Sequence, residues 1–338
     1  MKAEPSDTVL LASEAGRNND GGKAIVMLMR LPAGSGQPAL GSEANGFPLK
    51  HRALALLRVV QMSSYVMGVR AWQSLQRVAW MRSGPDARME DLEREGIFSR
   101  RLSPVRKQAL ADAARPWFVR LEAWRAAVPQ GGRQYCHTRS VPARRDAPGL
   151  YEAVADALDE AGILSSVRNY LGCRAEVRSV ALQINDEHDN FWRAHFGERG
   201  LPVPPTAFFH IDNTYGVVKA IFYLSDVGEA NGPFSYVPRT HRLEVGWFEA
   251  LILRAVDIWI DVYPQERPLF AALPRSLRRK AKFGDDLVAG DAQGQWLLEH
   301  ERVMTSRDGD VFVFDVNGVH RGGMVKEGER RIIQVMMS

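Results

Sequence analysis

The chain has 338 residues, of which 45% are hydrophobic and 25% are charged, an ordinary composition for a globular protein with a sizeable core. Its formal net charge of +4 suits an anionic ligand but does not by itself indicate nucleic acid, and we find no interleaved aromatic and basic motif of the RNA-binding kind. Two cysteines without a CxxC pattern, Cys136 and Cys173, argue against a disulfide framework or a cysteine-based zinc site.

The first 20 residues lack the basic start and long apolar stretch of a secretory signal. The longest apolar runs, such as AIVMLM at 24–29, are too short to cross a bilayer. These features predict a cytoplasmic protein.

The N-terminal half of the chain is predicted to be a leader followed by helices. Residues 1–48 are rich in Gly, Ser, Ala and Asn, which indicates a flexible leader. Apolar residues then recur every three to four positions up to Arg82, typical of a helix that also carries several arginines. Such a basic helix packs on its own domain or lies on a membrane surface, and both alternatives stay open. With further helices over about 86–128 and 148–171, residues 49–171 form a helical region that we expect to pack on the core.

Residues 172–338 have a different pattern. Short segments rich in β-branched and aromatic residues alternate with Gly, Pro and Asn, at a spacing typical of a jelly-roll. A helical insertion with a basic tail interrupts them at about 243–298. The predicted fold is therefore α+β: a double-stranded β-helix (jelly-roll, cupin-like) core with N-terminal helices and a helical insertion.

Two segments of this half contain candidate metal ligands. In TAFFHIDNTYG at 206–216, His210 and Asp212 are two apart, so they share one side of a strand. In GDVFVFDVNGVHRGG, a strand and a loop precede His320, and Arg331 follows in a final strand. Two histidines and one carboxylate form the facial triad of non-haem iron(II) oxygenases. A buried arginine can hold a second carboxylate in a bidentate pair, so these parts together would bind iron and a chelating keto acid.

The same motifs resemble a known family. His210-x-Asp212, YLSDVGEANGPFSYVPRTHR at 223–242, GDVFVFDVNGVHRGG and Arg331 occur in the order seen in the phytanoyl-CoA dioxygenase family. That family is a branch of the Fe(II)/2-oxoglutarate-dependent oxygenases. The resemblance covers about residues 175–338.

The resemblance implies specific roles. His210, Asp212 and His320 would bind Fe(II), and Arg331 would pair with the distal carboxylate of 2-oxoglutarate. With O2, the enzyme would hydroxylate an unactivated C–H bond and release succinate and CO2. Related halogenases lack the carboxylate of Asp212, so its presence favours hydroxylation.

Several positions leave alternatives open. Arg239 and Thr240 replace the family's usual Gly-Ser, and Gly322 replaces a serine that often helps to bind the keto acid. Arg330 competes with Arg331, because successive strand residues face opposite ways and both faces carry apolar neighbours. Family spacing favours Arg331.

Further candidates are less specific. Gln183 and Asn185 share one strand face, where they contact the keto acid or solvent. The insertion is either a lid over the site, since specificity often resides in loops on rigid scaffolds, or a helical cap whose basic tail is solvated. Asp315 is expected either to support the metal ligands or to be solvated, and not to bind metal. The candidate substrate contacts are Trp247, His241 (with a structural role as its alternative) and Arg239.

The substrate is expected to be a small, anionic or lipid-linked metabolite, and no nucleic-acid partner is expected. One alternative is a non-catalytic jelly-roll protein that binds an anionic membrane or a partner through basic surfaces at 50–82 and 275–282. Another is a cupin-type metal-dependent isomerase or lyase, which would not need Arg331.

Overall fold

The structure of the chain is a computed structural model. The expected leader at 1–48 lies almost wholly outside the residues that the structure describes, as does most of the insertion at 243–298. The described residues are 48–80, 87–127, 138–172, 174–187, 205–206, 209–212, 216–242, 248, 251–252, 254–256, 269, 272–274, 277, 292–306 and 310–338.

The first half of the described chain is mainly helical, as the apolar periodicity predicts, but it also contributes two strands. Pro148 begins one helix, where its fixed φ suits the first turn, and Gly172 ends another with a left-handed φ of 67°. The elements are α1 (Leu49–Trp80), α2 (Ala87–Arg94), β1 (Ile97–Arg101), α3 (Pro104–Ala127), β2 (Thr138–Ser140), α4 (Pro148–Glu160) and α5 (Ile163–Leu171).

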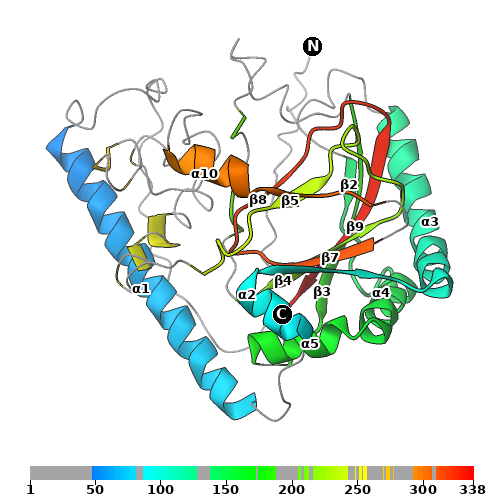
Figure 1. Ribbon diagram of the computed structural model, residues 1–338, viewed down its shortest axis with the longest axis horizontal. Coiled ribbons are helices and arrows are strands. Elements are labelled where there is room, and N and C mark those ends of the chain that lie inside the picture. Colours follow the sequence, from blue (N-terminus) through cyan, green and yellow to red (C-terminus); the bar gives the residue numbers. More distant parts are fainter. Residues whose placement is uncertain are drawn as a thin grey trace, which may run out of the picture. The chain divides into compact units, whose positions relative to one another are not determined.

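The second half supplies most of the strands (Figure 1). They form two antiparallel sheets, with orders β1-β7-β4-β9-β3-β2 and β6-β5-β8. The jelly-roll prediction is confirmed. The elements are β3 (Val177–Asp186), β4 (Val218–Tyr223), β5 (Phe234–Tyr236), α10 (Ala292–His300), β6 (Arg302–Met304), β7 (Asp310–Asp315), β8 (His320–Gly322) and β9 (Glu329–Met337).

Both edge strands of the large sheet come from the region that we expected to be helical. β1 pairs with β7, and β2 pairs with β3. β1 lies between α2 and α3, inside the stretch 86–128 where we predicted helix only. Its five residues are too few to show a strand period in the sequence. Pairing with β7, which is distant in the sequence, therefore decides its conformation.

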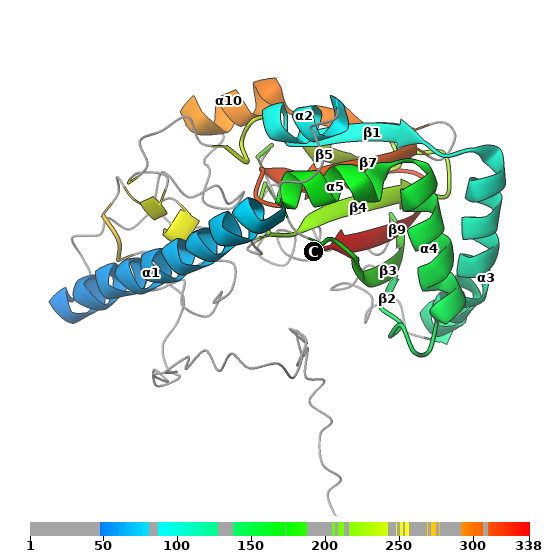
Figure 2. The ribbon, with the colours of Figure 1, turned by 90° about the horizontal axis from the view of Figure 1, so that it is seen from below.

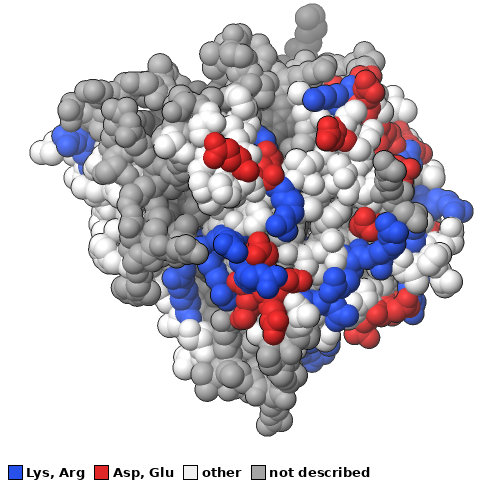
Figure 3. Space-filling view, in the orientation of Figure 1, with Lys and Arg blue, Asp and Glu red and all other residues white. Residues whose placement is uncertain are grey.

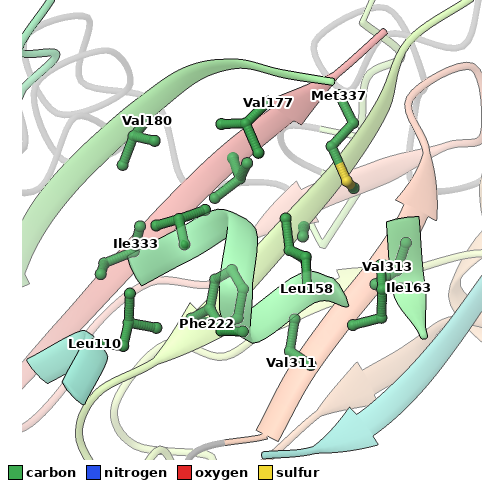
Figure 4. Close-up of a cluster of buried hydrophobic side chains, with 14 of the residues drawn as sticks. Leu110, Leu158, Ile163, Val177, Val180, Phe222, Val311, Val313, Ile333 and Met337 are labelled. Atoms are coloured by element: carbon green, nitrogen blue, oxygen red, sulfur yellow. The ribbon is translucent and has the colours of Figure 1, made fainter. Parts of the chain in front are cut away.

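One face of the large sheet is covered by α3, α4 and α5 (Figures 1 and 2). Alternate residues of each strand enter this helix-covered core, as expected from strand geometry. On β9 these are Ile333, Val335 and Met337, and on β7 they are Val311 and Val313. Figure 4 shows several of them with Leu110, Leu158 and Ile163 from the helices.

The opposite face of the large sheet packs against the small sheet. Ile221, Phe314 and Ile332 from the large sheet meet Phe234 and Tyr236 of β5 in a second apolar cluster. The strand residues that alternate with those of the helix-covered core therefore point into the space between the two sheets.

The long helix α1 packs on residues of the insertion. Ala55, Val59 and Val66 are buried with Leu251 and Leu273 in a separate apolar cluster. Among the described helices, none is both long enough and apolar enough to cross a membrane.

Candidate metal centre

Main-chain hydrogen bonds place the three predicted metal ligands side by side. The His210 N–H donates to the His320 carbonyl at 3.0 Å, and the His320 N–H donates to the His210 carbonyl at 2.9 Å. The Asp212 N–H donates to the Val316 carbonyl at 2.8 Å. Phe209 and Ile211 alternate with the ligands and enter a different apolar cluster. His210 and Asp212 therefore turn together toward the space between the sheets.

The ligand atoms of His210, Asp212 and His320 all lie within 4.8 Å of one another. His210 Nε2 is 3.7 Å from Asp212 Oδ1, and His320 Nε2 is 3.5 Å from Asp212 Oδ2. His320 Nδ1 donates to the Gly318 carbonyl at 2.8 Å, which leaves Nε2 free to bind metal. Two imidazoles and one carboxylate on one side of an open space are the donor set of a non-haem iron site.

The residues around Asp212 favour the ionised form of its carboxylate. Burial alone would raise the pKa of its carboxyl, but the ammonium of Lys219 and the two imidazoles outweigh burial and hold that pKa well below its usual range. Lys219 Nζ contacts Asp212 Oδ2 directly. Sequence reasoning missed Lys219; the available signal was a single charge in the apolar strand VVKAIFY.

A buried polar network fixes the turn that carries His320. The Asp315 carboxylate accepts the Asn317 N–H at 2.8 Å and the Tyr170 hydroxyl at 2.5 Å. Arg254, from the insertion, donates at 2.7 Å to the carbonyls of Asn317 and His241. Asp315 is thus buried in this network and lies outside the three-residue ligand group, which favours the supporting role over the solvated one.

The ligands open into a cavity of about 310 Å³ between the two sheets. Its wall combines charged and amide side chains with aromatic and aliphatic ones. The lining residues in the described part of the chain are Arg139, Gln183, Asn185, Asp186, His210, Asp212, Lys219, Ile221, Tyr223, Phe234, Phe314, His320, Gly322, Gly323, Met324, Val325, Arg330, Ile332 and Gln334.

Of the two adjacent arginines of β9, Arg330 lines this cavity, whereas Arg331, which we expected there, does not. Arg330 shares its strand face with Ile332 and Gln334, which also line the cavity. Arg331 lies on the helix-covered face, where it pairs with Glu122 of α3 at 2.6 Å and with Glu329 at 2.5 Å.

Arg330 is a buried cation without a carboxylate partner among the described residues. It is 6% exposed, and burial lowers the pKa of its guanidinium. One nitrogen donates to Asn185 Oδ1 at 3.2 Å, while Nε is buried and has no hydrogen-bond partner in the described part of the chain. A buried donor without a hydrogen-bond partner lowers the stability of the fold, which indicates that a bound ligand supplies the missing acceptor.

Three neighbours complete the surroundings of Arg330. The Tyr223 hydroxyl accepts the Phe234 N–H at 2.8 Å and keeps its own proton for a ligand, since burial raises its pKa. A Cβ added at Gly322 would lie 3.7 Å from an Arg330 nitrogen, so the missing serine would have stood beside the guanidinium. Gln183, bonded to Gln334 at 3.0 Å, also lines the cavity. Gln183 and Asn185, the two polar residues that we predicted on one strand face, thus both face the cavity.

The predicted substrate contacts are not assembled in the same way. His241 is buried outside this cavity lining, and its Nε2 donates to the Glu93 carbonyl at 3.2 Å, which favours the structural alternative for it. Arg239 is exposed and lies 3.6 Å from Glu95, with a φ of 68° at the position where the family has glycine. Trp247 lies outside the described residues.

Comparison with known proteins gives one family match. The family model for phytanoyl-CoA dioxygenase matches residues 106–333, more than half of the chain, beginning well before the motifs that carry the resemblance in the sequence. No curated protein matches.

Solved structures with a similar arrangement share little sequence with the chain. EctD from S. alaskensis with 2-oxoglutarate and 5-hydroxyectoine has 15% identity and a TM-score of 0.44, covering 77% of this chain and 78% of EctD. SnoK, a non-heme alpha ketoglutarate dependent carbocyclase from nogalamycin biosynthesis, has 17% identity and a TM-score of 0.43, covering 75% of this chain and 87% of SnoK. HygX from Streptomyces hygroscopicus with nickel and 2-oxoglutarate bound has 13% identity and a TM-score of 0.43, covering 76% of this chain and 87% of HygX.

Proposed function

The chain belongs to the phytanoyl-CoA dioxygenase family of Fe(II)/2-oxoglutarate-dependent oxygenases, and on that premise we propose that it hydroxylates an unactivated C–H bond of a small metabolite, anionic or lipid-linked. Succinate and CO2 would be the co-products. The observation that carries this proposal is the buried guanidinium of Arg330, which has no carboxylate partner among the described residues and lies in the same cavity as His210, Asp212 and His320.

The residues present fit both the metal and the co-substrate. His210, Asp212 and His320 offer the two-nitrogen, one-oxygen donor set that suits Fe(II). Arg330 offers a guanidinium whose Nε is buried without a partner among the described residues. A carboxylate bound there would form a charge-assisted, bidentate pair. Together, the metal and 2-oxoglutarate would supply the oxidising chemistry that transfers an oxygen atom from O2 to a C–H bond.

The protein's own side chains bind and orient the reactants. Arg330 would hold the distal carboxylate of 2-oxoglutarate, and the Tyr223 hydroxyl would donate to the same group in place of the serine that Gly322 replaces. Asn185 holds the guanidinium in position through the hydrogen bond at 3.2 Å. Phe234, Phe314 and other apolar residues of the wall limit water near the ligands.

Hydroxylation is favoured over halogenation because Asp212 occupies the position that a halide would need. The alternative of a cupin-type isomerase or lyase gives no role to a buried cation such as Arg330. A purely membrane-binding or partner-binding protein likewise gives no reason for a polar cavity with converging metal ligands.

Isotope labelling tests this proposal. The iron-loaded protein is incubated with 2-oxoglutarate and 18O2 in the presence of a fractionated pool of acidic and lipid-linked metabolites. We expect a product that gains one 18O atom, formed in proportion to succinate and absent with Asp212→Ala. A product that forms without consumption of 2-oxoglutarate would favour the isomerase instead. Succinate formation coupled to a product without 18O would refute hydroxylation.

A further inference from the structure

The cavity wall contains more positive charge than the metal and the co-substrate require. Three cations line it: Arg139, Lys219 and Arg330. Two carboxylates, Asp186 and Asp212, also line it. Asp186 is already in contact with Arg125, whose side chain lies outside the lining. Among the described residues of the lining, Asp212 is therefore the carboxylate that faces the three cations.

Arg139 enters the cavity from the edge strand β2. It pairs in register with Gln183 of β3, so the two side chains share the cavity face. Arg139 is also exposed, which places it at the open side of the cavity. Within the described part of the chain, Arg139 has no hydrogen bond or ion pair. Its guanidinium is attracted by the charge of Asp212 without contacting that carboxylate.

Several arginines of the described surface, in contrast, pair with a nearby carboxylate. In the view of Figure 3, Lys and Arg side chains lie beside Asp and Glu over much of the described surface. Arg145, for example, is 86% exposed and still pairs with Asp146 at 3.2 Å. A cation that lines a cavity without a carboxylate partner is therefore a candidate ligand-binding group.

Lys219 lies on the same face of the large sheet, on β4 with Ile221 and Tyr223. Its side chain is 14% exposed and contacts Asp212. When a divalent ion binds His210, Asp212 and His320, the carboxylate shares its charge with that ion. Lys219 then keeps only part of its counter-charge and can accept a second anion.

The charge balance decides what that second anion is. A divalent metal and the dianion of 2-oxoglutarate cancel, so the three cations and Asp212 leave an excess of two positive charges among the described residues of the wall. We propose that the substrate carries a carboxylate or phosphate group that Arg139 and Lys219 bind at the open side of the cavity. This inference rests on the proposed function, because it takes Arg330 to be occupied by 2-oxoglutarate.

The physical consequence is selection for anions. Arg139 presents a planar guanidinium that can bind either anion through two hydrogen bonds, and Lys219 adds a compact charge. A neutral analogue of the same substrate would leave Arg139 without an anionic partner, and Lys219 with only the metal-bound Asp212, in a partly dehydrated cavity. The anionic group would thus anchor one end of the substrate near the metal.

Calorimetry on protein loaded with Ni(II) and N-oxalylglycine, an inert analogue of 2-oxoglutarate, tests this inference. Inorganic phosphate and acetate are titrated separately at low ionic strength. We expect saturable binding of at least one of them, and the tighter anion identifies the substrate group as phosphate ester or carboxylate. Arg139→Gln and Lys219→Met should each weaken this binding by about fivefold or more, whereas Arg145→Gln should not change it.

Three results would overturn the inference: no binding of either anion to the loaded protein, unchanged binding in Arg139→Gln, or loss of N-oxalylglycine affinity in Arg139→Gln to the same degree. The last result would assign Arg139 to the co-substrate. Affinity for Ni(II), measured separately for Lys219→Met, keeps the anion effect apart from an effect on Asp212. A wild-type protein that binds neither Ni(II) nor N-oxalylglycine would instead contradict the proposed function.

Discussion

Arg330 and Arg331 are adjacent on β9, but their side chains lie on opposite faces of the six-stranded sheet. Arg330 is buried in the cavity with its Nε unpaired among the described residues, and Arg331 pairs with Glu122 and Glu329 over α3. Of the two guanidiniums, the one free to bind a carboxylate is thus the one that also lies beside the metal ligands.

Substituting each arginine separates the two roles. Arg330→Gln should weaken 2-oxoglutarate binding by about 100-fold, because truncating one partner of a buried charge pair costs about 2–5 kcal/mol. Arg331→Gln should leave that affinity unchanged and lower the free energy of unfolding by about 0.5–1 kcal/mol, since its ion pairs are half-exposed. Calorimetry with the Ni(II)-loaded protein measures the first, and urea denaturation the second. The opposite pattern would restore Arg331 as the co-substrate clamp.

The hydroxyl of Tyr223 should contribute measurably to co-substrate binding. Tyr223→Phe removes one hydrogen bond to a carboxylate, which we expect to weaken 2-oxoglutarate binding by about tenfold. It also leaves the Phe234 N–H without its acceptor, at a cost of about 1–3 kcal/mol in stability. Adding Gly322→Ser should recover much of the affinity and none of the stability, because a Cβ there fits 3.7 Å from Arg330. A double variant that binds no better than Tyr223→Phe would show that position 322 does not reach the co-substrate.

Arg254 should couple the insertion to the metal centre. It is 2% exposed, and its two hydrogen bonds at 2.7 Å hold the carbonyls of Asn317 and His241. Arg254→Met should destabilise the fold by about 3 kcal/mol and weaken Ni(II) binding by about tenfold, since the turn that carries His320 loosens. Arg242→Met, at an exposed arginine nearby, is the matched control. Unchanged Ni(II) affinity in a destabilised Arg254→Met would limit Arg254 to a role in folding.

His241 should make the stability of the fold depend on pH. Burial lowers the pKa of its imidazole, although Asp315 partly opposes the shift. The folded protein thus prefers neutral His241, and the unfolded chain binds the extra proton below its ordinary pKa of about 6.5. The stabilisation is therefore present above about pH 6.5 and is lost as the pH falls toward the lower pKa of the folded state. As the pH is lowered from 8 to 5, the denaturation midpoint should decrease less steeply in His241→Gln than in the wild type. Equal slopes of midpoint against pH in the two proteins would assign the pH dependence to other groups.

The metal ligands could be predicted from sequence because their signal is local. The H-x-D spacing puts two side chains on one face, and the ordered motifs after it resemble a family whose distal histidine precedes a Gly pair. The jelly-roll could be predicted for a related reason, since turn residues and β-branched segments alternate through the second half.

The choice between Arg330 and Arg331 could not be made in this way. Both faces of β9 carry apolar residues, because one packs on α3 and its neighbouring helices and the other on the small sheet. Only the tertiary position of α3, which brings Glu122 to Arg331, decides the orientation. Arg139 was missed because β2 is three residues long and owes its conformation to pairing with β3.

The most direct test of the metal centre is an anaerobic titration with Fe(II) and 2-oxoglutarate, followed by visible absorption. The account predicts a charge-transfer band that saturates with 2-oxoglutarate, persists in Arg331→Gln, weakens in Arg330→Gln and is absent in Asp212→Ala. A well-folded wild-type protein that shows no such band would contradict it.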